Sequence, residues 1–195
     1  MRSLICFCLS VFLTLTLSAQ NSPKGLNLND KAPVFTARDQ YGKTISLSDE
    51  LKKGPVVLVF YRGQWCPYCN RQLKQLEDSV SQIQQKGATV LTITPEVQEN
   101  IEKTISKTKA SYPILHDEGL RIMKSYEVAF RVDDKTIETY KKYGIDFIQA
   151  NGQENGANLP VPAVYVISKE GKIIYKHFDT DYRKRASVKE ILAHL

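Results

Sequence analysis

Hydrophobic and polar positions follow two different periods along the chain, and the changes of period predict strands alternating with helices. Residues 56–61, 88–93 and 163–167 are short apolar runs rich in β-branched side chains, which is typical of strands buried on both faces. Between residues 73 and 83 apolar side chains instead recur at intervals of three and four, along one face of a helix. Further helices are expected near residues 97–109, 119–126, 133–143 and 188–195.

This alternation predicts an α/β domain whose central sheet is mixed, mostly parallel and flanked by helices. Residues 33–36 and 44–47 flank the turn sequence QYGK, which favours an N-terminal β-hairpin. In such sheets, sites form where the carboxyl ends of strands meet the N-termini of helices. Residues 62–69 follow a predicted strand and precede a predicted helix, so this junction is the expected site.

Residues 127–160 have the least regular pattern, and residues 151–158 are expected to form a loop. The segment is long for a connection in a compact fold. It is therefore predicted to be an insertion that forms a lid near the site, or a subunit contact in a homodimer.

Composition and charge narrow the function classes. The 195 residues suit one domain, 42% of them are hydrophobic, and the net charge of +6 is spread along the chain. The densest basic cluster, residues 182–185, is expected to be a solvated turn. Because no broad basic face with interleaved aromatic residues is evident, nucleic-acid binding is not predicted.

The first residues have the pattern of a secretory signal peptide. Residues 4–17 carry no charge, and Leu17-Ser18-Ala19 offers a cleavage site, so residues 1–19 are expected to be removed. The apolar run is shorter than the roughly 20 residues of a spanning helix, so no stable membrane insertion is expected after cleavage. Residues 20–32 are predicted to be a linker and residues 33–195 the domain. The expected location is the periplasm or the exterior.

After cleavage two cysteines would remain, Cys66 and Cys69. A thiol in the first turn of a helix faces unpaired N–H groups and the positive end of the helix dipole, which lower its pKa. A second thiol three residues later can close onto the first sulfur. The pattern predicts a redox-active dithiol. A structural disulfide would close too small a ring to stabilise much, and zinc lacks further ligands, so neither a metal nor another cofactor is expected.

Neighbouring residues are expected to shape this site. Pro67 suits a first helical turn, Trp65 and Tyr68 are candidates to flank the sulfurs, and Arg62 is a candidate to hold a thiolate or an anionic substrate. The bond between Val161 and Pro162, just before a strand, is a candidate cis peptide that would lie beside the dithiol.

The stretch "VVLVFYRGQWCPYC" followed by an amphipathic helix resembles the thioredoxin superfamily. With "KAPVFTARDQYGKTISLSD" and "LPVPAVYVISKEGKIIYKHFDTDYRKR", the chain is similar to the peroxiredoxin-like branch of the alkyl hydroperoxide reductase/thiol-specific antioxidant family. The resemblance implies a thioredoxin fold, a hydroperoxide substrate and an external thiol reductant such as a thioredoxin-like protein.

The match to the peroxiredoxin motif is partial. It places the peroxidatic position on Cys69, the Thr/Ser position on Cys66, the Pro position on Arg62 and the late Arg position on Pro162. Thioredoxins carry a cis-proline at this last place, which the resemblance extends to Pro162.

Thioredoxins also carry a buried acid in the strand before the motif, where this chain has Leu58 or Val59, so that proton acceptor is expected to be missing.

The sequence thus predicts an exported thiol-dependent peroxidase with an antioxidant role that cycles Cys66 and Cys69 between dithiol and disulfide. A thiol–disulfide oxidoreductase that attacks protein disulfides through Cys66 is the alternative. A binding module without catalytic activity is a third hypothesis, against which the intact cysteine pair counts.

Overall fold

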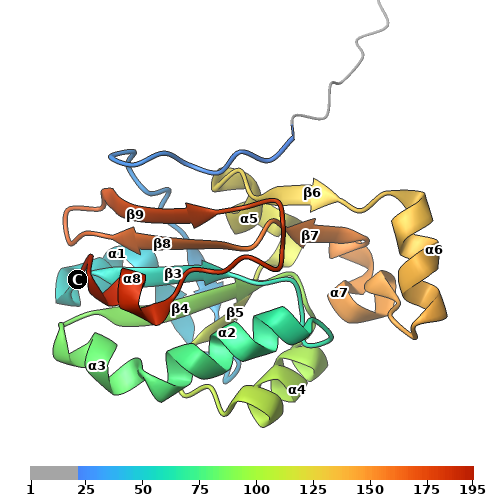
Figure 1. Ribbon diagram of the computed structural model, residues 1–195, viewed down its shortest axis with the longest axis horizontal. Helices are drawn as coiled ribbons and strands as arrows, with labels where there is room; N and C mark the ends of the chain where they lie inside the picture. Colours follow the sequence, from blue (N-terminus) through green and yellow to red (C-terminus); the bar gives the residue numbers. More distant parts are fainter. Residues whose placement is uncertain (1–21) are drawn as a thin grey trace, which may run out of the picture.

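The computed structural model describes residues 22–195, so the predicted signal peptide at residues 1–19 lies outside the described residues. A five-stranded sheet forms the centre of the molecule (Figure 1). Its strands, in spatial order, are β5 (Ile114–His116), β4 (Thr89–Thr94), β3 (Val56–Phe60), β8 (Ala163–Ile167) and β9 (Ile173–Phe178). The predicted mixed α/β architecture is confirmed. β5, β4 and β3 pair parallel with one another, whereas β8 pairs antiparallel with both β3 and β9.

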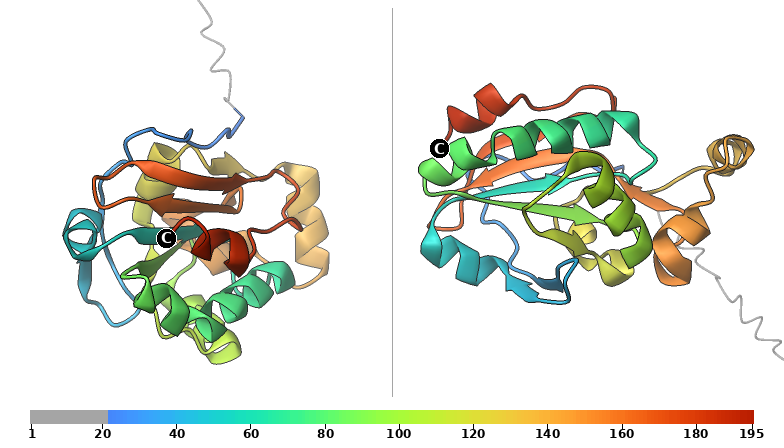
Figure 2. Two further views of the ribbon diagram at one scale, coloured as in Figure 1. Left: turned by 60° about the vertical axis from the view of Figure 1, so that its left-hand side comes forward. Right: turned by 90° about the horizontal axis from the view of Figure 1, so that it is seen from below.

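Helices cover both faces of this sheet, as the continuous apolar strands require. One face packs against α2 (Pro67–Asp78), α3 (Val80–Gln85), α4 (Gln98–Thr108) and α8 (Val188–Leu192). The other packs against α1 (Leu47–Lys53), α5 (Arg121–Ser125) and the predicted N-terminal hairpin of β1 (Thr36–Arg38) and β2 (Thr44–Ser46). Figure 2 shows α1 and this hairpin on the side of the sheet opposite α8.

The central strand β3 shows why the fold needs both layers. Val57 and Val59 point into the cluster beneath α2, while Leu58 and Phe60 join the cluster beneath α1 and α5. All five residues of β3 are fully buried. A strand of this kind fixes the start of the next loop firmly, which matters because that loop carries the cysteines.

The predicted helix through residues 73–83 is interrupted. Ser79 leaves the helical conformation with φ −117° and ψ 4°, so α2 ends at Asp78 and α3 begins at Val80. Within residues 22–195 every helix is too short or too polar to cross a bilayer.

The segment that the composition predicts as a linker is packed where the structure describes it. The backbone N–H of Gly25 donates to the carbonyl of Glu127 at 3.1 Å, and the N–H of Asn29 donates to that of Ile173 at 2.9 Å. Ala32 is buried in the core. Residues 24–32 therefore run along the edge of the sheet.

Residues 129–160, called the cap below, project at one end of the sheet (Figures 1 and 2). The cap comprises β6 (Ala129–Arg131), α6 (Asp134–Lys142), α7 (Phe147–Asn155) and β7 (Asn158–Pro160), with β6 and β7 paired antiparallel. The short 3₁₀ helix η1 (Glu118–Leu120) lies beside α7.

The predicted loop at residues 151–158 is wrong for most of its length, because α7 extends to Asn155 with a break at Gly152, where φ is 81° and ψ 165°. Asp146 caps the helix by accepting from the N–H groups of Ile148 and Gln149 at 2.8 and 3.1 Å. At the other end, Asn155 is buried and its Nδ2 donates to the carbonyls of Pro95 and Asp117 at 2.8 and 3.1 Å. Polar residues, whose abundance suggests a loop, here cap the start of a helix and donate hydrogen bonds to buried carbonyl groups.

Candidate active site

The junction between β3 and α2 carries the two cysteines, as predicted. Cys66 is the N-cap of α2 in an extended conformation, and Pro67 occupies the first helical position, where its missing N–H is not needed. The Cys66 Sγ accepts the backbone N–H of Cys69 at 3.3 Å. A sulfur thus fills the place that a serine or aspartate oxygen commonly occupies at a helix start.

Both cysteines are free thiols and both are buried. Their acidities differ. The Cys69 side chain donates to Cys66 and, with the backbone N–H of Cys69 and the charges of Arg62 and Arg185, outweighs burial and lowers the pKa of Cys66 to about 6. Burial raises the pKa of Cys69 well above its ordinary value, and the charge on Cys66 raises it further. Near neutral pH the pair therefore holds one thiolate, on Cys66, and one thiol, on Cys69.

Arg185 contacts both sulfurs. Its Nη2 lies 3.4 Å from the Cys69 Sγ and 3.9 Å from the Cys66 Sγ. The expected solvated turn at residues 182–185 is therefore wrong at this residue, although Arg183 and Lys184 are exposed and pair with Asp181 and Asp179. No local pattern predicts this contact, since it depends on how the chain between β9 and α8 crosses the end of the sheet.

Arg62 is buried and links the site to the cap. Its Nη2 donates to the Tyr140 hydroxyl at 2.7 Å. Its guanidinium also lies 4.3 Å from the ring centroid of Tyr182 and 4.9 Å from that of Trp65, within the range of cation–π attraction. Because these contacts are aromatic rather than ionic, the Arg62 charge stays available to the thiolate.

The two aromatic residues of the motif face different neighbours. The Trp65 ring packs edge-on against Tyr140 and Phe147 of the cap, with centroids 5.3 and 5.6 Å apart. The Tyr68 ring packs against Tyr182 at 5.8 Å. Both lie beside the dithiol, and they connect it to the cap and to the chain after β9.

The structure brings Val161 and Pro162 to the site, because Ala163 pairs with Phe60 at the end of β3. Together with Arg62 they line an open cavity of about 780 Å³ under α6. The predicted cis bond is wrong, since the described residues contain no cis peptide. Val161 directly follows β7, and its N–H donates to the Val128 carbonyl at 2.8 Å.

Glu96, in the loop after β4, was missed by sequence reasoning. Its carboxyl group is fully buried, and Oε2 accepts the backbone N–H of Gln64 at 2.8 Å. Burial raises the pKa of Glu96 to about 8, against the lowering effect of the Gln64 N–H. Leu58 and Val59 are apolar as expected, and a buried carboxyl group instead lies just after the neighbouring strand, β4. The parallel pairing of β3 with β4 explains its position, because the residues that follow two parallel strands lie at the same edge of the sheet.

The described residues contain no cluster of three or more His, Cys, Asp or Glu side chains that could hold a metal ion. The titratable groups at the sulfurs are instead the partner thiol and two arginines. This is a site for thiol chemistry.

Comparison with known proteins agrees with this chemistry. Residues 28–176 match the AhpC/TSA family, so the chain belongs to that family. The chloroplastic peroxiredoxin Q of Suaeda salsa is 35% identical over 96 residues, which are 49% of this chain and 44% of the relative. The chain spans about half the length of the curated relatives it matches.

Solved structures show the fold. Peroxidoxin BcpB of Mycobacterium tuberculosis superposes with a TM-score of 0.65 at 20% identity, over 86% of this chain and 94% of that one. A cysteine-to-serine variant of Xylella fastidiosa PrxQ gives 0.66 at 15% identity, over 87% and 95%. The predicted thioredoxin-like fold and peroxiredoxin-type family are confirmed.

Proposed function

We propose that the protein is a thiol peroxidase that reduces hydroperoxides through a disulfide between Cys66 and Cys69. The observation that carries this proposal is a thiolate and a thiol three residues apart, both within reach of the Arg185 guanidinium. Membership of the AhpC/TSA family supports it.

The first step is attack on the peroxide. The Cys66 thiolate attacks one peroxide oxygen, the O–O bond breaks, and the departing alkoxide takes a proton and leaves as an alcohol. Cys66 becomes a sulfenic acid. Arg185 lies where it can stabilise the negative charge as it moves from sulfur to oxygen.

The second step forms the disulfide. The Cys69 sulfur attacks the Cys66 sulfur, the S–OH bond breaks, and hydroxide leaves with a proton as water. An external dithiol, such as a thioredoxin-like protein, then returns the two electrons by thiol–disulfide exchange.

We assign the attack to Cys66, although the family resemblance places the peroxidatic position on Cys69. The lower pKa of Cys66 supports this order, because only the thiolate is strongly nucleophilic. Cys69 keeps its proton until it resolves the sulfenic acid.

A stopped-flow experiment tests the assignment. Reduced protein is mixed with hydrogen peroxide, and the fluorescence of Trp65, the single tryptophan, is followed beside Cys66→Ser and Cys69→Ser. We expect the fast phase to disappear in Cys66→Ser and the first oxidation to persist in Cys69→Ser. The reverse pattern would assign the attack to Cys69.

A thiol–disulfide oxidoreductase is the second candidate, and two observations favour it. The thiolate sits at the helix N-cap, and Pro162 stands where peroxiredoxins keep an arginine. Stopped-flow fluorescence of Trp65 also distinguishes the two functions. A slow reaction with peroxide, combined with a fast one with a small disulfide, would establish the second candidate.

We further propose, from residues 1–19 alone, that the protein is exported. Cell fractionation of the full chain tests this, and retention in the cytoplasm would refute it.

A further inference from the structure

Glu96 lies directly beneath the loop that leads to Cys66. A Cβ atom on Gly63 would fall 2.5 Å from the Trp65 Nε1 and 2.7 Å from the Glu96 Oε1, so the loop lies close against both side chains. Oε2 accepts the Gln64 N–H, while Oε1 is buried without a partner among the described residues. The Cys66 N–H donates to the Gly63 carbonyl, so one short turn joins the carboxyl group to the reactive sulfur.

None of the described cationic side chains forms an ion pair with this carboxyl group, although the charges of Lys107 and Lys103 lower its pKa against the effect of burial. On α4, Lys103 pairs with Glu99 at 2.7 Å, and Lys107 donates to the Gln64 carbonyl at 3.0 Å. On β5, the His116 Nδ1 meets the Glu96 backbone carbonyl rather than its carboxyl group. After β3, Tyr61 is buried and its hydroxyl contacts Thr104. On α2, Cys66 is the group whose charge opposes ionisation of Glu96.

The balance of charge at the dithiol changes when Cys66 and Cys69 are oxidised. Among the described residues neither Arg62 nor Arg185 forms an ion pair with a carboxylate, and the charges of both favour the Cys66 thiolate. A disulfide removes that anion and leaves two largely buried guanidinium groups uncompensated, which is costly. Loss of the thiolate also removes the charge that opposes ionisation of Glu96, one short turn away, so the disulfide favours the Glu96 carboxylate.

We propose that Glu96 exchanges its proton with the redox state of the pair, being a neutral acid beside the reduced pair and a carboxylate beside the disulfide. The overall change is Cys66–S⁻ + Cys69–SH + Glu96–COOH + ROOH → Cys66–S–S–Cys69 + Glu96–COO⁻ + ROH + H₂O. One negative charge is present before and after. The inference rests on the proposed Cys66–Cys69 cycle, and Glu96 acts in it as a positioning residue that sets the charge around the sulfurs.

The first test counts protons. Residues 22–195, which hold every described element, are equilibrated with reduced and oxidised dithiothreitol from pH 6 to pH 8, between the pKa values of Cys66 and Glu96. Oxidation of the wild-type site releases two protons, which matches dithiothreitol, so the equilibrium constant changes little with pH. In Glu96→Gln it releases one, so the constant for protein oxidation falls about tenfold per pH unit. Glu99→Gln, an exposed carboxylate on α4, is the matched control and should follow the wild type.

The second test needs no variant, in case Glu96→Gln does not fold. Infrared difference spectra between reduced and oxidised wild-type protein should show loss of a protonated carboxyl band on oxidation. Equal pH dependence in wild type and Glu96→Gln, or no such band in the wild type, would overturn the inference. Because dithiothreitol replaces the peroxide, these results are independent of whether the peroxidase activity itself is found.

Discussion

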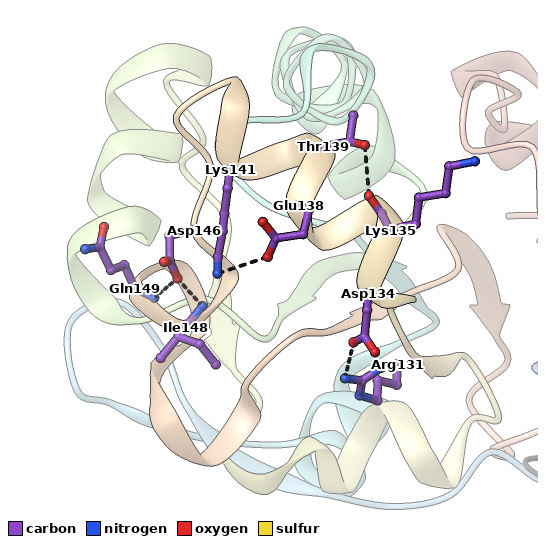
Figure 3. Close-up of polar contacts among 9 residues, drawn as sticks. All are labelled: Arg131, Asp134, Lys135, Glu138, Thr139, Lys141, Asp146, Ile148 and Gln149. Atoms are coloured by element: carbon purple, nitrogen blue, oxygen red, sulfur yellow. Dashed lines mark hydrogen bonds and ion pairs between the residues drawn. The ribbon is translucent and has the colours of Figure 1, made fainter.

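The β3–α2 junction and the cap meet at the active site but are built in opposite ways. Every residue of β3 is fully buried, and the Cys66 Sγ closes the first turn of α2. Helix α6 of the cap has no buried residue. Apart from the hydrogen bond between Arg62 and Tyr140, its polar contacts are local and exposed, as Figure 3 shows for Arg131 with Asp134 and Lys141 with Glu138. Exposed pairs of this kind contribute little stability.

This difference in burial suggests that the junction holds the sulfurs in place and that the cap adjusts their reactivity. The sulfurs sit at the end of a fully buried strand, whereas a residue that tunes them, Arg62, is tied through Tyr140 to α6, the helix of the cap that buries no residue. Changes to the junction should therefore alter stability, and changes to the cap should alter reactivity with little loss of stability.

The largest expected effect breaks the junction. Leu73→Ala removes a fully buried side chain beneath α2, and we expect a loss of about 2–5 kcal/mol in the free energy of unfolding. Ile137→Ala is the matched change in the cap, where the side chain is only partly buried, and should cost about 1 kcal/mol or less. Urea denaturation measures both. Similar losses would mean that the cap belongs to the same cooperative core.

Removal of Arg185 should act on chemistry instead. Arg185→Met takes a guanidinium from 3.4 Å of the Cys69 Sγ and raises the pKa of Cys66, so alkylation at neutral pH should slow about tenfold. Reduction of peroxide should slow about 100-fold, because the charge that moves to oxygen also loses its donor. Arg183→Met, on the exposed neighbour, is the control. Unchanged rates in Arg185→Met would remove this residue from the site.

Arg185 and the two cysteines show which parts of the site can be predicted from the sequence. The alternation of apolar runs with helical spacing predicts the sheet, its helices and the position of Cys66 and Cys69, because each depends on neighbouring residues. Arg185 lies 119 positions from Cys66, and its contact depends on the path of the chain after β9. Helix α7 was not predicted for a related reason. Its last residue, Asn155, is held by hydrogen bonds to the carbonyls of Pro95 and Asp117, which lie far from it in the sequence.

The pH dependence of Cys66 sharpens the contrast between the two thiols. Alkylation of Cys66 should rise about tenfold per pH unit and level off above its pKa of about 6. Cys69→Ala removes the side-chain donor and should move this midpoint upward. The pKa of Cys66 in the folded protein is below the ordinary value of 9.0, so its stabilising effect is complete above pH 9 and is lost as the pH falls through 6. A midpoint that stays in place in Cys69→Ala would show that Cys69 does not donate to the thiolate.

The smallest expected effect tests the tie between cap and junction. Tyr140→Phe removes the hydroxyl that accepts from Arg62 at 2.7 Å but keeps the ring that packs on Trp65. One such hydrogen bond contributes about 0.5–1.5 kcal/mol, so Cys66 alkylation should change by about two- to tenfold. Amide exchange in α6 should quicken by a similar factor, while global stability stays within about 1 kcal/mol. Tyr143→Phe changes an exposed hydroxyl just beyond the same helix and should alter neither rate. If Tyr140→Phe behaved like Tyr143→Phe, Arg62 would be held by the Trp65 and Tyr182 rings alone, and the cap would not tune the thiolate through this contact.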